Sequence, residues 1–224
     1  MTELKSWAET AQLRQGLYRF FGGALLPPEN HRTQAVLASA GYLDGLGIEA
    51  FAFAGPWDSM LDSLELLPAA SDLSAEYVRL FASGMDGELC PPNESFYRAD
   101  AEGGGLAVAV ANVQREYAEM GLSPITTTEP PDHVTSELEA MASLCAREVA
   151  YWDENQPKEA RAMLDTERSF LRRHLAVWFP AFHGRVARSG RLAFYTTTVE
   201  AAHAFLIHEV DFIGWMLGVL EQEE

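Results

Sequence analysis

Apolar residues recur along most of this chain at intervals of three and four, which is the spacing of one face of an α-helix. The pattern predicts helices over about residues 6–21, 30–43, 56–67, 73–83, 106–120, 132–152, 157–180 and 191–220. No stretch alternates for long between apolar and polar residues, and no Asn-Gly hairpin turn occurs, so we expect no strands. The sequence therefore predicts an all-α fold.

No feature of the chain divides these helices into separate domains. There is no linker rich in proline and serine, and there is no repeat period. Two loops, around residues 82–102 and 121–131, separate the helices into two groups, and we expect any binding groove to lie between those loops. We therefore expect one helical domain that spans residues 1–224.

Glycine and proline mark the ends of several predicted helices. Gly22 and Gly23 are expected to stop the first helix, and Asn30 can cap the second with its side-chain oxygen. Pro157 suits the first turn of a helix, where a missing N–H leaves no intrahelical bond unmade. We expect that helix to continue as far as Pro180.

The stretch from Glu76 to Arg98 departs from the general pattern. Just before and within its first half, four residues share one helical face, namely Leu73, Tyr77, Leu80 and Phe81. The loop that follows is unusually apolar, with Leu89, Cys90, Pro91, Pro92, Phe96 and Tyr97. Paired prolines hold the backbone extended and remove two amide donors, which suits the wall of a groove. A buried connector that closes the core is the alternative interpretation.

The excess of acidic residues restricts the kinds of molecule that the protein is expected to bind. The chain has 33 acidic and 16 basic residues, for a formal net charge of −17. Nucleic-acid binding relies on clustered Lys and Arg, so this balance weighs against it and favours a cationic partner. An acidic surface that only aids solubility is the other interpretation.

The cysteines and the apolar runs indicate the compartment. Cys90 and Cys145 lie far apart without a CxxC pair, so we expect buried free thiols in a reducing compartment rather than a disulfide or a zinc site. The first residues lack a cationic segment followed by an apolar run, and the apolar stretch Phe212–Leu220 is short for a membrane span. We expect a soluble, cytoplasmic protein that does not insert into a membrane.

Three polar residues stand at the start of the helix predicted over 132–152. Asp132 follows two prolines, where a carboxylate can cap the first turn and meet the positive end of the helix dipole. His133 and Glu137 are four apart, so their side chains can form a pair or offer two metal ligands on one face. A metal site needs further ligands on that face, and we expect no metal there.

No motif in the chain points to catalysis or to a bound cofactor. Ser95 follows Glu94 in the predicted loop, but no GxSxG elbow is present, and neither cysteine has a recognisable base partner. The glycines at 103–105 are not followed by Lys-Ser or Lys-Thr, as a phosphate loop requires. We expect no catalytic residue and no cofactor, and a small helical enzyme using Asp132, His133 and Glu137 is the minor alternative.

Five segments in series resemble the TorD/DmsD/NarJ family of redox-enzyme maturation chaperones. They read EYVRLFASG, LCPPNESFYR, EPPDHVTSELEAM, FLRRHLAVWFPAF and RLAFYTTTVEAAHAFL, and they cover most of the chain in the family's order. The family's motif positions fall on Tyr77, Leu80, Phe81, Pro91, Pro92, Ser95, Tyr97, Pro131, Asp132, His133, Glu137 and Leu138. Asn93 and Glu94 stand where other members carry tryptophan or glycine, so the branch and the client stay open.

The resemblance implies a cytoplasmic, TorD-like helical bundle, either a monomer or a domain-swapped homodimer. Its expected partner is the apo-form of a molybdenum oxidoreductase catalytic subunit, held by its twin-arginine signal peptide before export. A NarJ-type assembly factor for a subunit that is not exported is the alternative. The expected peptide-binding residues are Tyr77, Leu80, Phe81, Pro91, Pro92, Glu94, Ser95, Tyr97, Asp132, His133 and Glu137. An arginine pair followed by an apolar run needs acidic groups beside apolar ones, and this set offers both.

Overall fold

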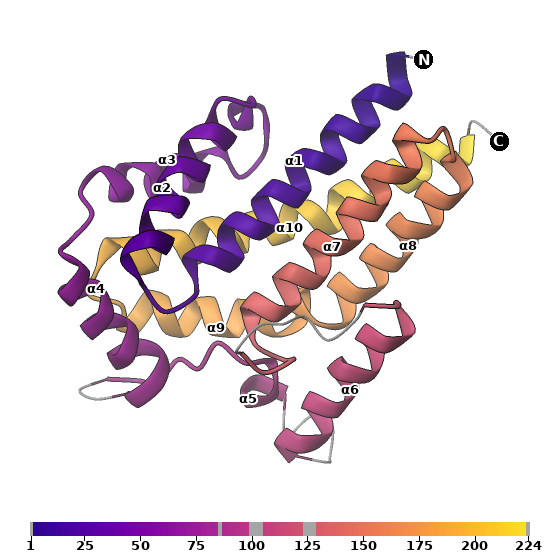
Figure 1. Ribbon diagram of the computed structural model, residues 1–224. Helices are drawn as coiled ribbons and strands as arrows, with labels where there is room; N and C mark the ends of the chain where they lie inside the picture. Colours follow the sequence, from indigo (N-terminus) through magenta and orange to yellow (C-terminus); the bar gives the residue numbers. More distant parts are fainter. Residues whose placement is uncertain (1, 85–86, 99–104, 123–128, 223–224) are drawn as a thin grey trace.

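The computed structural model of the chain is built from helices (Figure 1). It describes residues 2–84, 87–98, 105–122 and 129–222, with side chains from residue 6 onward. Helices make up 81% of the chain, and within the described ranges there is no strand, only an isolated bridge between Asn93 and His133. The predicted all-α class is confirmed.

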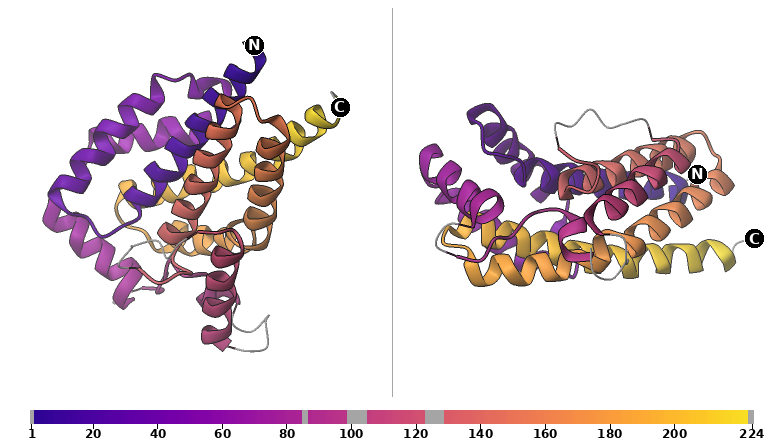
Figure 2. Two further views of the ribbon diagram at one scale, coloured as in Figure 1. Left: turned by 45° about the vertical axis from the view of Figure 1, so that its right-hand side comes forward. Right: turned by 90° about the horizontal axis from the view of Figure 1, so that it is seen from below.

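Four long helices form the main body of the protein. They are α1 (Thr2–Ala24), α7 (Val134–Asp153), α8 (Pro157–Arg173) and α10 (Ala193–Gln222). Helix α1 packs along α7, and α7 packs on α8. Helix α10 runs behind them in Figure 1 and packs against α8 and α9 (Leu175–Ser189). Both chain ends lie at the same end of this body (Figures 1 and 2). The apolar stripes of these helices meet in one continuous core.

Shorter elements complete the fold around that body. They are α2 (Asn30–Asp44), η1 (Ile48–Ala50), α3 (Ala54–Glu65), α4 (Ala70–Tyr77), the π-helix η2 (Val78–Ser83), α5 (Glu94–Arg98) and α6 (Gly105–Glu119). Helix α2 packs on α1, and α3 packs on α10. Helix α5 packs on both α6 and α9, at the end of the body opposite the chain termini (Figures 1 and 2). Helices α5, α6 and α9 carry much of the candidate site.

A buried arginine joins the four long helices. Arg14 of α1 is 3% exposed, and its guanidinium bonds one glutamate from each of the other three helices. The distances are 2.7 Å to Glu148, 2.5 Å to Glu167 and 2.9 Å to Glu209. Burial, together with the charge of Glu148, raises the pKa of Glu167 to about 8, so this carboxyl holds a proton near neutral pH. A proton here reduces the excess of negative charge around Arg14.

Several helix boundaries differ from the predicted ones. Helix α1 runs through Gly22 and Gly23 to Ala24, because both glycines are packed within the helix bundle. Glu29 rather than Asn30 is the N-cap residue of α2, without a side-chain capping bond. Of the three consecutive glycines, Gly103 and Gly104 lie outside the described residues.

The helix predicted over 157–180 is in fact two helices. Helix α8 ends at Arg173, His174 takes a non-helical conformation with φ −118° and ψ −98°, and α9 then begins at Leu175. Pro180 lies inside α9 rather than at its end. The prediction failed because apolar spacing continues across His174 and does not reveal a break between two helices that share one core.

Helix α10 is long and apolar enough to pass a length and hydropathy test for a membrane span. In the structure it packs on α3, α8 and α9, and its buried residues include Glu209, which bonds Arg14. Helix α10 is therefore a core helix of the bundle.

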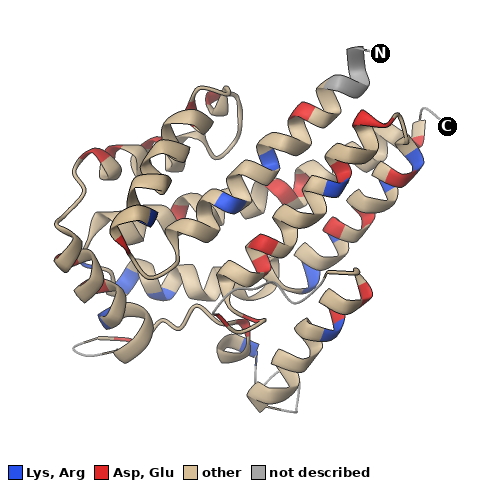
Figure 3. Ribbon diagram, viewed as in Figure 1, with Lys and Arg blue, Asp and Glu red and all other residues tan. Residues whose placement is uncertain are grey.

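Acidic residues appear on most of the helices, whereas α9 carries basic residues and no acidic ones (Figure 3).

Candidate functional site

Tyr77, Leu80 and Phe81 belong to the core in this structure. Their exposed fractions are 9%, 0% and 7%. The Phe81 ring lies 5.5 Å from Tyr195 and 5.9 Å from Phe182, as measured between ring centres. They therefore support the site from within, and their contact with a peptide stays a prediction.

The chain changes from α-helical to π-helical between Tyr77 and Val78, within the face that carries these residues. Short π-helical segments frequently occur at functional sites. Gly84 ends the segment with φ +61°, and a Cβ there would lie 2.8 Å from the Cβ of Leu89. This close approach turns the chain back into the apolar loop.

The two loops expected to border the site are hydrogen-bonded to each other. The N–H of Glu94 donates to the Asp132 carbonyl at 2.9 Å, and the N–H of Val134 donates to the Pro92 carbonyl at 2.8 Å. Pro92 is buried and Pro91 is half-buried. The segments at 91–95 and 131–134 thus form one wall, although they lie some forty residues apart in sequence.

Ser95 and Glu94 lie in helix α5, not in a loop as predicted. The Asp132 carboxylate accepts a hydrogen bond of 3.2 Å from the Ser95 N–H, so Asp132 caps α5 and not the helix that it precedes in sequence. The N-cap of α7 is His133, whose Nδ1 accepts from the Thr135 N–H at 3.2 Å. The expectation that Asp132 caps its own helix was wrong, because His133 takes the N-cap position of α7 and the Asp132 carboxylate turns to the neighbouring α5.

An aromatic cluster joins α5 and α9, and Phe96 is its exposed member. The Tyr97 ring stacks on Trp178 at 5.5 Å and lies 6.3 Å from Phe182. The Arg185 guanidinium sits 4.9 Å from the Phe96 ring centre, in the range of a cation–π contact. Phe96 is 39% exposed, so an apolar surface remains open to a ligand here.

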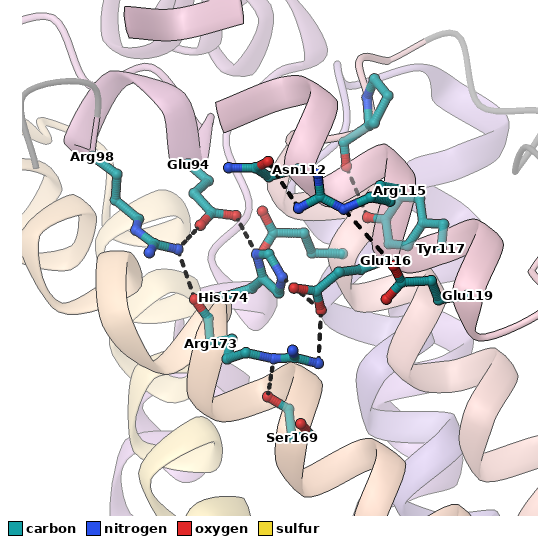
Figure 4. A network of polar contacts seen from close by, with 12 residues as sticks. Glu94, Arg98, Asn112, Arg115, Glu116, Tyr117, Glu119, Ser169, Arg173 and His174 are labelled. Carbon is teal, nitrogen blue, oxygen red and sulfur yellow. Dashed lines mark hydrogen bonds and ion pairs between the residues drawn. The ribbon is translucent and has the colours of Figure 1, made fainter. Parts of the chain in front are cut away.

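Glu94, His174 and Glu116 form a polar network between α5, α6 and the break after α8 (Figure 4). His174 Nδ1 lies 2.7 Å from Glu94 Oε2, and its Nε2 lies 3.1 Å from Glu116 Oε2. The second contact is close but lacks good hydrogen-bond alignment, since neither atom has a directed partner among the described residues. Burial opposes ionisation of Glu94, but the hydrogen bonds and charges of His174 and Arg98 lower its pKa below the ordinary value.

Glu137 has the opposite electrostatic character. It is 0% exposed, and burial, followed by the nearby charge of Glu94, raises its pKa well above the ordinary value. Its Oε2 accepts a hydrogen bond of 3.0 Å from the Trp178 indole, whereas its Oε1 finds no donor among the described groups. A protonated Glu137 can instead donate to the Glu94 carboxylate, so the two carboxyls share one negative charge.

His133 and Glu137 do not form the pair that their spacing allowed. His133 Nε2 faces Glu129 at 3.8 Å, and Glu137 turns to Trp178. Burial lowers the pKa of His133, although Glu129 and Asp132 oppose the shift. Metal-ligand atoms gather instead at Cys145, Glu148 and Glu167, but Arg14 already bonds both of these carboxylates.

A cavity of about 790 Å³ lies elsewhere, between α1 and α2. Leu13, Phe20 and Leu43 line it, together with the exposed Tyr42. None of the predicted site residues borders it. The site residues instead surround a closed cluster of buried side chains.

The structure brings part of the predicted residue set together, and the binding of a peptide by that set stays a prediction. The structure brings Glu94, Ser95, Tyr97, Asp132 and Glu137 together, while Tyr77, Leu80 and Phe81 lie behind them in the core. The residues missed were His174, Trp178, Phe182, Arg185 and Glu116. The FLRRHLAVWFPAF segment carries part of the family resemblance, but none of its residues is in the predicted peptide-binding set.

A known protein family matches most of this region. The family described as nitrate reductase delta subunit matches residues 50–184, which is more than half of the chain and includes Glu94, Glu137 and His174. The chain belongs to this family. The predicted resemblance to the TorD/DmsD/NarJ group is thereby confirmed.

Two known proteins are similar to this chain over about two thirds of its length. The selenate reductase assembly chaperone protein of Thauera selenatis is 30% identical over 150 residues, which are 66% of this chain and 76% of the relative. The chlorate reductase assembly chaperone protein of Ideonella dechloratans is 29% identical over the same shares. The family and these relatives are assembly proteins rather than catalysts, so the chain is not an enzyme.

A solved structure supports the fold. The crystal structure of a redox enzyme maturation protein from Archaeoglobus fulgidus superposes with a TM-score of 0.58. The superposition covers 87% of this chain and 93% of the other, at 22% sequence identity. At this identity the likeness concerns the helical fold alone.

Proposed function

We propose that the protein is a cytoplasmic chaperone for a molybdenum-cofactor oxidoreductase. It binds the twin-arginine signal peptide or N-terminal segment of the apo catalytic subunit and holds that subunit until the cofactor is inserted, before export. The names of the selenate and chlorate reductase relatives support a client of this class. The chaperone itself carries no cofactor and acts as a monomer or a domain-swapped homodimer.

The observation that carries this proposal is the combination of acidic and aromatic groups at α5. Arg98 of the chain itself is ion-paired with Glu94, and Arg173 lies 3.0 Å from Glu116. Beside these carboxylates lies the Phe96 and Tyr97 surface. A leader with two arginines followed by an apolar run would match both halves of this region.

Calorimetric titration with a synthetic leader tests the proposal. The probe is a peptide with an Arg-Arg pair followed by an apolar run, and the control peptide carries Gln-Gln in place of the arginines. We expect the first peptide to bind more tightly. Each charge-assisted hydrogen bond contributes about 1.5–3 kcal/mol to the binding free energy when it is desolvated, and less at an exposed rim. Equal affinity for both peptides would remove the basis for arginine recognition.

The second candidate is a NarJ-type factor for a subunit that is not exported, and the family's nitrate reductase description favours it. Such a factor binds an N-terminal segment without an arginine pair, so its affinity should depend on apolar contacts. Phe96→Ala should then weaken binding strongly, while replacing the arginines should change little. The two peptides and this variant together separate the candidates.

A further inference from the structure

The carboxylates of Glu94 and Glu116 face the two nitrogens of one buried imidazole. His174 is 3% exposed and lies between them, with Glu94 on α5 and Glu116 on α6 (Figure 4). Glu116 remains partly accessible, with 12% of its side chain exposed. The two acids therefore come from different helices and meet at one imidazole, with Glu94 buried and Glu116 partly accessible.

Each of these two carboxylates is already ion-paired with an arginine of the protein itself. Arg98 pairs with Glu94 and also donates to the Arg173 carbonyl at 2.6 Å. Arg173 reaches Glu116 at 3.0 Å from the other side (Figure 4). These arginines are accessible, with 22% and 56% of their side chains exposed, so water or a ligand can reach and displace them.

Polar atoms without a directed partner mark the interior of the same cluster. His174 Nε2 and Glu137 Oε1 are buried and accept or donate no aligned hydrogen bond among the described groups. Buried groups of this kind are uncommon in folded proteins and call for an explanation. Glu137 can donate its proton to Glu94, whereas His174 Nε2 faces the Glu116 carboxylate at 3.1 Å.

The other two acids of the predicted site are poorly suited to recognise a charge. Asp132 is as buried as Glu94, but its carboxylate is already used to cap α5 through the Ser95 N–H. Glu137 is fully buried and favours its neutral form. Glu94 and Glu116 are both engaged by arginine side chains, and both contact His174.

We propose that Glu94 and Glu116 form a receptor for two neighbouring guanidinium groups, and that Arg98 and Arg173 occupy this receptor until a ligand replaces them. This proposal rests on the proposed function and names the groups that read the arginine pair. The exchange swaps one guanidinium for another on each carboxylate, so no buried charge is left unpaired at any stage.

Self-occupation makes the receptor selective. A ligand must replace two fork-shaped guanidinium groups, and an ammonium group offers no matching planar pair of donors. Isolated cations gain little, because the internal arginine competes for the same oxygens. A peptide with adjacent arginines and an apolar run gains additional contacts on Phe96 and outcompetes the internal pair.

Removing the internal arginines tests the receptor. We expect Arg98→Gln and Arg173→Gln each to raise the affinity for the Arg-Arg leader by about two- to fivefold, since an exposed ion pair contributes modestly. Arg172→Gln is the matched control, because Arg172 is exposed beside Arg173 and has no charged partner among the described residues. Arg98→Lys, which keeps the charge, provides a second variant if Arg98→Gln loosens α5.

Neutralising Glu116 tests the receptor from the other side. Glu116→Gln should weaken binding of the Arg-Arg leader by about tenfold and leave the Gln-Gln leader unchanged. Glu119→Gln on the same helix is the control, because Glu119 is 64% exposed and faces Arg115 rather than the cluster. Wild-type affinity in Glu116→Gln, or an equal gain in Arg172→Gln and Arg173→Gln, would overturn the proposal.

A probe without an apolar run separates this proposal from the proposed function. Acetyl-Arg-Arg-amide should shift the indole N–H resonance of Trp178 in the Arg98→Gln/Arg173→Gln double variant at lower concentration than in the wild type. If this occurs while no leader binds, the receptor holds and the chaperone function fails. If leaders bind but neither the dipeptide nor the charge variants show an effect, the function holds and the receptor is wrong.

Discussion

Neighbouring glutamates in this protein differ in charge because their surroundings differ. Glu94 accepts from His174 and Arg98, and its pKa is lowered, whereas Glu137 meets only one indole donor and another acid, and its pKa is raised. The difference gives each residue one task, with Glu94 offering charge and Glu137 holding a proton inside the core. At this scale, burial alone does not decide which acid can bind a cation.

Phe81 and Phe96 are expected to differ in role, Phe81 stabilising the core and Phe96 contacting the peptide. Phe81→Ala removes a ring that is 7% exposed and packed on Tyr195 and Phe182, so we expect a loss of about 3–5 kcal/mol in the free energy of unfolding. Phe96→Ala removes a 39% exposed ring, and we expect a loss of about 1 kcal/mol or less together with weaker leader binding. Urea denaturation and calorimetry measure both quantities. A stable Phe81→Ala protein with weakened binding would place Phe81 at the peptide instead.

Glu167 gives stability a pH dependence of defined sign. Its pKa of about 8 in the folded protein lies above the ordinary value of 4.5, so the folded state keeps a proton that the unfolded chain releases. Its stabilising contribution is complete below about pH 4.5 and is lost as the pH rises toward 8, at up to about 1.4 kcal/mol per pH unit.

Glu167→Gln keeps an oxygen for Arg14 and has no proton to lose. We expect the unfolding free energy of this variant, relative to wild type, to rise between pH 5 and 8 in urea titrations. Glu159→Gln, an exposed change on the same helix, should show no such trend. A difference that stays flat over this range would mean that Glu167 is ionised in the folded protein.

Periodicity predicted the long helices well, because each buries one continuous stripe. It failed where tertiary contacts set the ends. Helix α5 has only five residues and is held by a cap from Asp132, which a local pattern cannot reveal. His174 interrupts an apolar run without any glycine or proline, so the break between α8 and α9 had no signal in the sequence.

The end of the π-helix η2 depends on one glycine. Gly84→Ala places a Cβ at φ +61° and 2.8 Å from the Cβ of Leu89, and we expect a loss of about 1–3 kcal/mol in the free energy of unfolding. Gly55→Ala in α3 is the control, since its Cβ meets nothing within 4 Å and alanine favours a helix by about 0.5–1 kcal/mol. Chemical denaturation followed by circular dichroism compares the two, and equal effects would contradict the close approach at Gly84.

The whole molecule depends on polar contacts that the sequence pattern hid. Arg14 and its three glutamate partners are all buried, but they come from four different helices, so no local spacing in the sequence links them. Their convergence requires four helices to be placed first. The same holds for the site, where Glu116 and His174 join α5 only in three dimensions. Family motifs identified the segments, and folding decided which side chains meet.

The last prediction concerns this buried junction. Arg14→Leu leaves Glu148, Glu167 and Glu209 without their shared cation, and removing one partner from a buried ionic group typically lowers stability by about 3–5 kcal/mol. Arg19→Leu on the same helix removes an exposed arginine that has no ion-pair partner within the described part of the chain, so it should change stability by about 0.5 kcal/mol or less. Thermal and urea unfolding of the two variants should therefore diverge widely at neutral pH. The gap should narrow toward pH 5, since protonation of the orphaned carboxyls relieves their repulsion in Arg14→Leu. A gap that does not change with pH would show that the cost comes from lost packing of the Arg14 side chain rather than from its charge.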